Sequence, residues 1–177
     1  MMAVVDYDPA WPIRFQEIGR RLRAAVGDMA LRIDHIGSTA VPGLAAKPVI
    51  DIQISVARLE PLGDYGAAIQ ELGYSFRPTN PDLTKRFFYS STEMQRCHIH
   101  VRRAGSWSEQ FALLFRDYLR SHAQDVRRYA ELKRSLATKD RDIEEYARLK
   151  GPFIWEIMIK ATDWSQAVGW EPGPRDA

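Results

Sequence analysis

The residues of this chain best suited to chemistry begin at Gly37, which is followed by the hydroxyl side chains of Ser38 and Thr39. Glycine has no Cβ, so the backbone can turn sharply here and approach a ligand closely. Hydroxyls and amide N–H groups at the start of a helix can bind phosphate oxygens. The turn is therefore a candidate phosphate site, and the alternative is an ordinary strand-to-helix turn capped by hydroxyls.

A single acid, Asp51, lies in the next apolar run, from Pro48 to Val56. Strand side chains alternate with period two, so Asp51 and Gln53 share one face, which should point toward the turn. A carboxylate in such a strand is costly to bury unless it is paired or metal-bound. In nucleotidyl transfer, carboxylates at two such positions hold magnesium, which stabilises the phosphate oxygens. Asp51 is a candidate catalytic and metal-binding residue, but the second position here is an amide.

Three histidines are candidate replacements for the missing carboxylate. His98 and His100 alternate on one face of a strand, and His35 precedes the glycine turn. Imidazole shifts metal preference from magnesium toward manganese, zinc, iron or nickel. We therefore expect a divalent metal, magnesium or manganese with a transition metal as the alternative, held by Asp51 with His35, His98 and His100, and we assign catalysis to Asp51 and His100. The alternative is a pair of half-buried strand histidines that bond to neighbouring side chains.

The candidate phosphate-binding side chains with positive charge are Lys47, Arg86, Lys133 and Lys150. Lys47 enters the strand of Asp51, where it can reach a phosphate held by the turn or remain a solvated loop residue. Arg86 opens an aromatic strand, either as a triphosphate clamp or as an edge charge that prevents aggregation. The other two lysines each follow a tyrosine by four residues, so each pair occupies one helix face. They can line a cleft opposite the sheet, or serve only helix packing.

The hydrophobic pattern predicts an α/β order followed by helices alone. Helices are expected from Pro12 to near Gly27 and from about 61 to 72, and strands over 31–37, 49–56, 74–77, 86–91 and 96–102. The short connection over 40–47 favours antiparallel neighbours. From Ser106 the period becomes helical, with three amphipathic stripes.

The whole pattern predicts one domain over 1–170, with a sheet part over about 1–104 and a helical part over about 105–166. Pro152 should kink or split the last helix, because proline removes a backbone donor and clashes with the preceding turn. The segment 171–177, with its prolines and glycine, is expected to be a flexible tail.

Composition agrees with a small enzyme or ligand-binding protein. The chain has 177 residues and a net charge of +2, so no global field for polyanions is expected, and nucleic acid could bind only through a local patch. One cysteine excludes an internal disulfide, and we find no bilayer-spanning run and no leader at Met1. These features favour a cytoplasmic protein without membrane contact.

Several motifs resemble the GrpB family of small bacterial proteins: HIGSTAVPGLAAKPVIDI, RCHIHV, FRDYLRSH and YAELK. The resemblance extends from Tyr7 to about Trp164. It implies the nucleotidyltransferase superfamily, and so an α/β (α+β) fold with a mixed sheet flanked by helices and a helical C-terminal half. Family members commonly lack the second carboxylate, and some relatives are fused to a dephospho-coenzyme A kinase domain, which points to nucleotide or coenzyme metabolism.

Two functions follow as expectations. The first is metal-dependent transfer of a nucleotidyl group from a nucleoside triphosphate to a small-molecule acceptor. The alternative is a nucleotide- or metabolite-binding protein that kept the cleft and lost transfer chemistry, as Gln53 makes reasonable. A third, weaker reading treats the histidines and Asp51 as a transition-metal site for hydrolysis.

Overall fold

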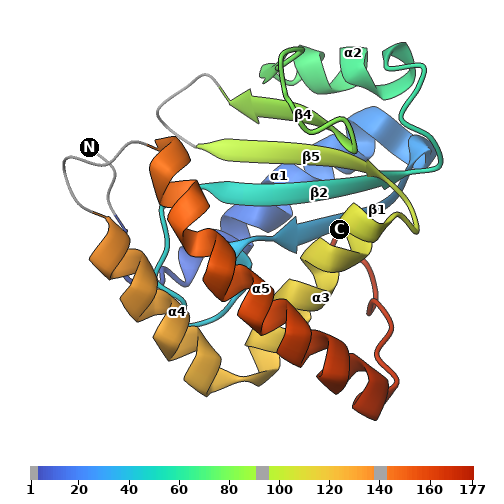
Figure 1. Cartoon of the computed structure of the whole chain (residues 1–177). Coiled ribbons are helices and arrows are strands. Elements are labelled where there is room, and N and C mark those ends of the chain that lie inside the picture. The colour runs from blue at the N-terminus through green and yellow to red at the C-terminus, as the bar shows by residue number, and fades with distance from the viewer. Residues whose placement is uncertain (1–3, 91–95, 138–142) are drawn as a thin grey trace.

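The computed structural model describes residues 4–90, 96–137 and 143–177, which form a five-stranded mixed sheet and five α-helices (Figure 1). The strands are β1 (Ala30–Ile36), β2 (Ile50–Val56), β3 (Tyr74–Phe76), β4 (Lys85–Ser90) and β5 (Cys97–Arg103). The α-helices are α1 (Ala10–Val26), α2 (Gly63–Glu71), α3 (Trp107–Ser121), α4 (Ala123–Leu136) and α5 (Ile143–Val168). Two short 3₁₀ turns, η1 (Gly27–Met29) and η2 (Ser38–Ala40), flank β1. The predicted α/β fold with a helical C-terminal half is confirmed.

The strand order in the sheet is β1-β2-β5-β4-β3. β1 and β2 pair antiparallel, as their short connection predicts, whereas β2 and β5 pair parallel. The remaining pairs are antiparallel. The predicted end of the fourth strand, at Ser91, lies outside the described residues. The parallel pair at the centre of the sheet is decisive for the site, since it aligns the strand of Asp51 with the strand of two histidines.

The two faces of the sheet have different chemistry. Apolar side chains of β1, β2, β4 and β5 form one core with α1, and its members include Phe15, Leu22, Ile33, Ile52, Ile54, Phe88, Ile99 and Val101. Because strand side chains alternate, the polar residues between them point to the opposite face. In Figure 1 α1 lies behind the sheet, and α3 and α5 lie on the other side. The polar face is thus covered by the helical half of the chain.

The helices α3, α4 and α5 build a second core of their own, which includes Tyr118, Leu119, Tyr129, Ile157 and Ala161. The predicted split of the last helix is wrong, because α5 runs unbroken through Pro152. Pro152 removes one backbone hydrogen bond of α5. The next residue, Phe153, stacks its ring on Tyr129 of α4 at 5.1 Å, and this tertiary contact supports the helix at that point. Within the described residues, none of the helices combines the length and the apolarity needed to cross a bilayer.

The C-terminal segment, predicted to be a flexible tail, ends against the edge strand β1. The amide of Ala177 donates to the carbonyl of Ile33 at 3.0 Å, and Asp176 accepts from the amide of His35 at 3.0 Å. Arg116 on α3 donates to the same Asp176 oxygen at 2.8 Å. An edge strand leaves backbone groups open, and these contacts satisfy some of them.

Candidate functional site

A carboxylate and two imidazoles meet on the polar face of the sheet. The parallel register sets Asp51 opposite His98 and Gln53 opposite His100. Asp51 Oδ1 lies 3.3 Å from His98 Nδ1 and 3.3 Å from His100 Nε2. The three potential ligand atoms lie within 4.8 Å of one another. The predicted convergence of Asp51 with the two histidines is present in the structure, and the donor set suits a divalent metal.

The protonation states of Asp51 and His100 favour the binding of a metal ion. Burial on its own would raise the pKa of Asp51, but the hydrogen bonds from His100 and His98 outweigh it and hold the pKa below its usual value. Burial lowers the pKa of His100 to about 4, although the neighbouring Asp51 opposes this shift. An ionised carboxylate beside a neutral imidazole is the protonation state that metal binding requires.

The glycine turn lies directly against Asp51. Gly37 has φ +70°, and a Cβ at this position would lie 2.6 Å from Asp51 Oδ2. Glycine is therefore required for both its backbone conformation and its close approach. Ser38 lines the adjoining pocket. Thr39 also borders it, but its hydroxyl lies 3.0 Å from His35 Nε2 and donates to the carbonyl of Val49 at 3.2 Å, so it joins the turn to the strands.

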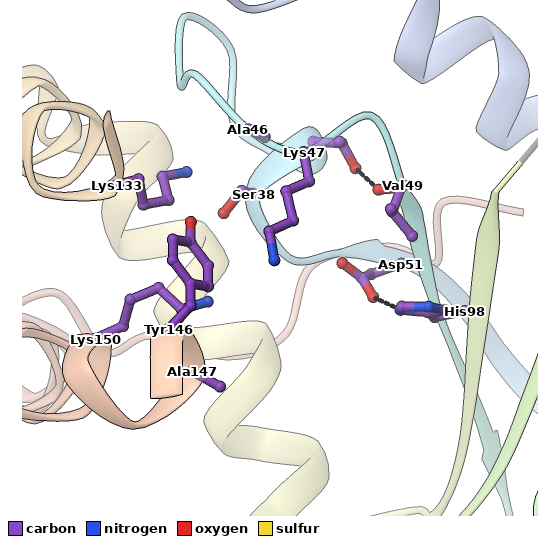
Figure 2. A pocket seen from close by; sticks show the side chains of 11 residues that line it. Ser38, Ala46, Lys47, Val49, Asp51, His98, Lys133, Tyr146, Ala147 and Lys150 are labelled. Atoms are coloured by element: carbon purple, nitrogen blue, oxygen red, sulfur yellow. Dashed lines mark hydrogen bonds and ion pairs between the residues drawn. The ribbon is translucent and has the colours of Figure 1, made fainter. Parts of the chain in front are cut away.

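Three lysines surround the pocket next to Asp51 and His98, which has a volume of about 200 Å³. Figure 2 shows Lys47 extending from the sheet side and Lys133 and Lys150 from the helical side, with Tyr146 between them. The Nζ atoms of Lys47 and Lys150 lie 4.1 Å and 4.6 Å from the centre of the Tyr146 ring. Burial lowers the pKa of all three lysines, to about 6 for Lys133. Residues more than eighty positions apart thus form one cationic pocket.

Two predicted site residues lie elsewhere. The ring of His35 stacks on Phe15 of α1 at 4.8 Å, on the apolar side of the sheet, and burial lowers its pKa to about 3. His35 is therefore not brought to Asp51. Arg86 binds Glu60 through Nε at 2.9 Å and Nη2 at 2.7 Å and does not line the pocket beside Asp51. Period-two alternation within β4 carries the side chain of Arg86 away from the site face.

Gln53 has partners of its own within the protein. It is fully buried; its Oε1 accepts from Arg102 at 2.6 Å, and its Nε2 donates to the carbonyl of Glu109 at 3.4 Å. The amide that stands in place of a second carboxylate is thus bonded to a cation. Sequence reasoning missed Arg102 and also Phe87, whose ring lies 5.2 Å from His98 and 5.2 Å from His100. Alternation along β4 and β5 was the signal that could have identified both.

Comparison with known proteins gives the same fold and a family. The crystal structure of the conserved protein GrpB from Enterococcus faecalis is 30% identical, with a TM-score of 0.83 over 93% of this chain and 99% of that chain. The Cid1 poly(U) polymerase with MgGTP bound has a TM-score of 0.53 and 14% identity over 75% of this chain and 44% of that chain, which shows a shared fold. The chain thus has the fold of nucleotidyltransferases.

Relatives at the sequence level agree. The UPF0157 protein BH1888 of Halalkalibacterium halodurans is 35% identical over 90% of this chain and 82% of its own length. A dephospho-CoA kinase of Mycolicibacterium paratuberculosis is also 35% identical. The match covers 96% of this chain but only 48% of the length of that kinase. The sequence model of the GrpB protein matches residues 1–160. This chain therefore belongs to the GrpB family.

Proposed function

We propose that this protein transfers a nucleotidyl group from a nucleoside triphosphate to a small-molecule acceptor, with a divalent metal bound at Asp51. The observation that carries the proposal is the adjacency of two groups in one pocket. Asp51 and His98 line the pocket, and His100 lies 3.3 Å from Asp51 behind them. Lys47 lines the same side of the pocket, and Lys133 and Lys150 line the helical side. The nucleotidyltransferase fold supports the same chemistry but does not establish it.

The chain's own residues suit the phosphate chain of the substrate. Lys47 and Lys150, together with Lys133 when it is protonated, supply positive charge that can neutralise phosphate oxygens, and Ser38 offers a hydroxyl beside them. Lys47 extends toward Asp51 in Figure 2, so a phosphate held by this lysine would lie close to the carboxylate. Orientation of the phosphates in this way lowers the barrier to transfer, because the reacting groups are held together.

The donor set on the sheet fits a divalent metal. Asp51, His98 and His100 would hold it, since their ligand atoms already lie within 4.8 Å of one another. When bound, such an ion would stabilise the charge that develops on the phosphate oxygens. His100 Nδ1 is buried and has no hydrogen-bond partner among the described residues.

We propose a small acceptor in preference to nucleic acid because the net charge of +2 provides no strong positive field along the surface. The site face of the sheet beyond Asp51 carries aromatic and basic side chains, including Phe87 and Arg102. Phe87 packs against both histidines and Arg102 binds Gln53, and we propose that the acceptor lies on this part of the sheet.

The decisive experiment measures the release of pyrophosphate from nucleoside triphosphates with magnesium or manganese present. Asp51→Asn removes the one charged ligand at nearly constant volume, so metal affinity should fall by more than the about 10- to 100-fold typical of changes to outer-shell partners. The matched control is Asp163→Asn, an exposed acid of α5, which should bind metal like the wild type. Equal metal affinity in the wild type and Asp51→Asn would exclude this metal site.

A binding protein without transferase activity is the second candidate. It is favoured by the Gln53–Arg102 pair, because a neutral amide that is already bonded to a cation stands where a second carboxylate would help to hold metal. Tight nucleotide binding with no release of pyrophosphate, under conditions where the metal is bound, would support this candidate over the first.

A further inference from the structure

Among the described residues, Lys133 on α4, which lines the pocket, has no acidic partner. Its side chain is 2% exposed, and Nζ has no hydrogen-bond partner among the described residues. Nζ lies 4.5 Å from the centre of the Tyr129 ring, which offers only a weak electrostatic partner. Burying an ammonium group in this way is costly unless a partner arrives from outside the protein.

Among the described residues, the charged groups around Lys133 do not stabilise a positive charge on its amine. Lys150 and Arg134 both repel a proton on its amine, and Lys47 lies across the pocket. Arg134 is itself paired with Asp6. The phenols nearby stay protonated, because burial raises the pKa of Tyr146 to about 12 and raises that of Tyr129 further.

The acidic side of the pocket is engaged elsewhere. Asp51 is the carboxylate among the pocket-lining residues, and its Oδ1 lies 3.3 Å from each of His98 and His100. The empty pocket therefore holds several basic groups and one acid that already has partners. An anion is the ligand that this imbalance selects.

We propose that the lysine pocket binds an oligophosphate anion, such as pyrophosphate or the phosphate chain of a nucleoside triphosphate, and that Lys133 takes up one proton as the anion binds. The proposal shares its phosphate pocket with the proposed function but does not require transfer chemistry. The amine accepts a proton from solvent, its charge changes from neutral to +1, and the ammonium then donates hydrogen bonds to phosphate oxygens.

The physical basis is the change of environment on binding. Burial, with added repulsion from Lys150, lowers the pKa of Lys133 to about 6, so the amine is largely neutral near neutral pH. An oligophosphate brings several negative charges into contact with it and raises the pKa again. The pocket volume of about 200 Å³ gives room for phosphate groups beside the lysines.

The test is calorimetric titration of the full chain with sodium pyrophosphate, without divalent ions, in buffers that differ in ionisation enthalpy. At about pH 7.5 the wild type should take up about one proton more per bound anion than Lys133→Arg, whose guanidinium is always charged. Comparing the two variants cancels the protons exchanged by pyrophosphate itself. Lys133→Met should weaken binding roughly 10- to 100-fold, the effect of losing one charge-assisted hydrogen bond.

Two controls separate binding from folding. Lys160→Met removes a lysine of α5 that pairs with Asp125 and Glu156, away from the pocket, and should leave affinity within about twofold. Lys133→Met should unfold at a temperature no lower than the wild type, because it removes an uncompensated polar group from the interior. A titration of ¹³C-labelled lysine by NMR gives the protonation of Lys133 directly, if Lys133→Arg does not fold.

Equal proton uptake in the wild type and Lys133→Arg, or an NMR signal of Lys133 that pyrophosphate leaves unchanged, would overturn the proposal. So would unchanged affinity in Lys133→Met. The outcome is separable from that of the proposed function. Release of pyrophosphate from a nucleoside triphosphate without proton uptake at Lys133 would refute only this inference. Proton-linked binding of pyrophosphate without any transfer would refute only the transferase.

Discussion

At the scale of single residues, histidines of this chain serve different purposes because their surroundings differ. His98 and His100 lie beside Asp51 on the polar face of the sheet, whereas His35 is 3% exposed and stacks on Phe15. Burial, with a further contribution from the charge of Arg120, lowers the pKa of His35 to about 3. His35 therefore stays neutral in the folded protein over most of the acidic range.

The burial of His35 makes the free energy of unfolding depend on pH. Between about pH 3 and about pH 6.5 the unfolded chain protonates His35 while the folded protein does not, so stability falls as the pH drops through this window. We expect His35 to contribute about 2 kcal/mol to the loss of stability between about pH 7 and about pH 4.5. His35→Gln, which does not titrate, should reduce this loss in urea unfolding curves at the two pH values. The same loss in both proteins would contradict the assignment.

At the scale of elements, the turn after β1 lies directly against Asp51, the proposed metal ligand. Gly37 combines a positive φ with a Cβ position only 2.6 Å from Asp51 Oδ2. Gly43 lies in the following connection with φ +76° and has no atom within 4 Å of its Cβ position. The two glycines share the backbone requirement, but only Gly37 is also in close contact with the site.

Gly37 and Gly43 allow the effect of backbone conformation to be separated from the effect of close contact. Alanine at either position should cost about 1–3 kcal/mol in the free energy of unfolding, because both residues have a positive φ that L side chains rarely adopt. Gly37→Ala should cost more and should also weaken metal binding, since the new methyl group displaces Asp51. Urea unfolding and metal titration of both variants check this. If Gly43→Ala affected metal binding as strongly as Gly37→Ala, the close contact would not be the cause.

At the scale of the whole molecule, the C-terminal segment joins the helical half to the edge of the sheet. Asp176 accepts from the amide of His35 on β1 and from Arg116 on α3, and Ala177 donates to the carbonyl of Ile33. Just before this segment, Trp170 donates through Nε1 to Asp117 at 3.2 Å. These contacts connect the outer strand to the layer that carries two of the pocket lysines.

Removal of residues 171–177 should therefore destabilise the whole fold. The truncation removes five hydrogen bonds between residues 176–177 and the rest of the described chain, of which at least three are partly buried. The loss of the partly buried bonds corresponds to about 2–4 kcal/mol and to a fall in melting temperature of roughly 5–15 °C. Asp176→Asn, which keeps the length and removes the charge, should give a smaller fall because Arg116 also binds Asp117. Differential scanning calorimetry measures both. A truncated chain that melts at the wild-type temperature would mean that the tail adds nothing to stability.

The sequence alone determined the features that depend on local geometry. Period-two alternation predicted that His98 and His100 share one strand face and that Asp51 points into the site. The short connection between β1 and β2 predicted their antiparallel pairing, which the structure confirms. These inferences succeeded because the alternation of side chains along a strand and the length of a connection can both be read from a few consecutive residues.

The tertiary structure decided the rest. Only the parallel pairing of β2 with β5 brought Asp51 beside His98, and only the packing of α4 and α5 against the turn brought Lys133 and Lys150 to Lys47. The exclusion of His35 and the docking of the tail likewise depend on contacts between residues far apart in sequence. Strand order and helix packing are set by the burial of whole faces, which a local pattern does not encode.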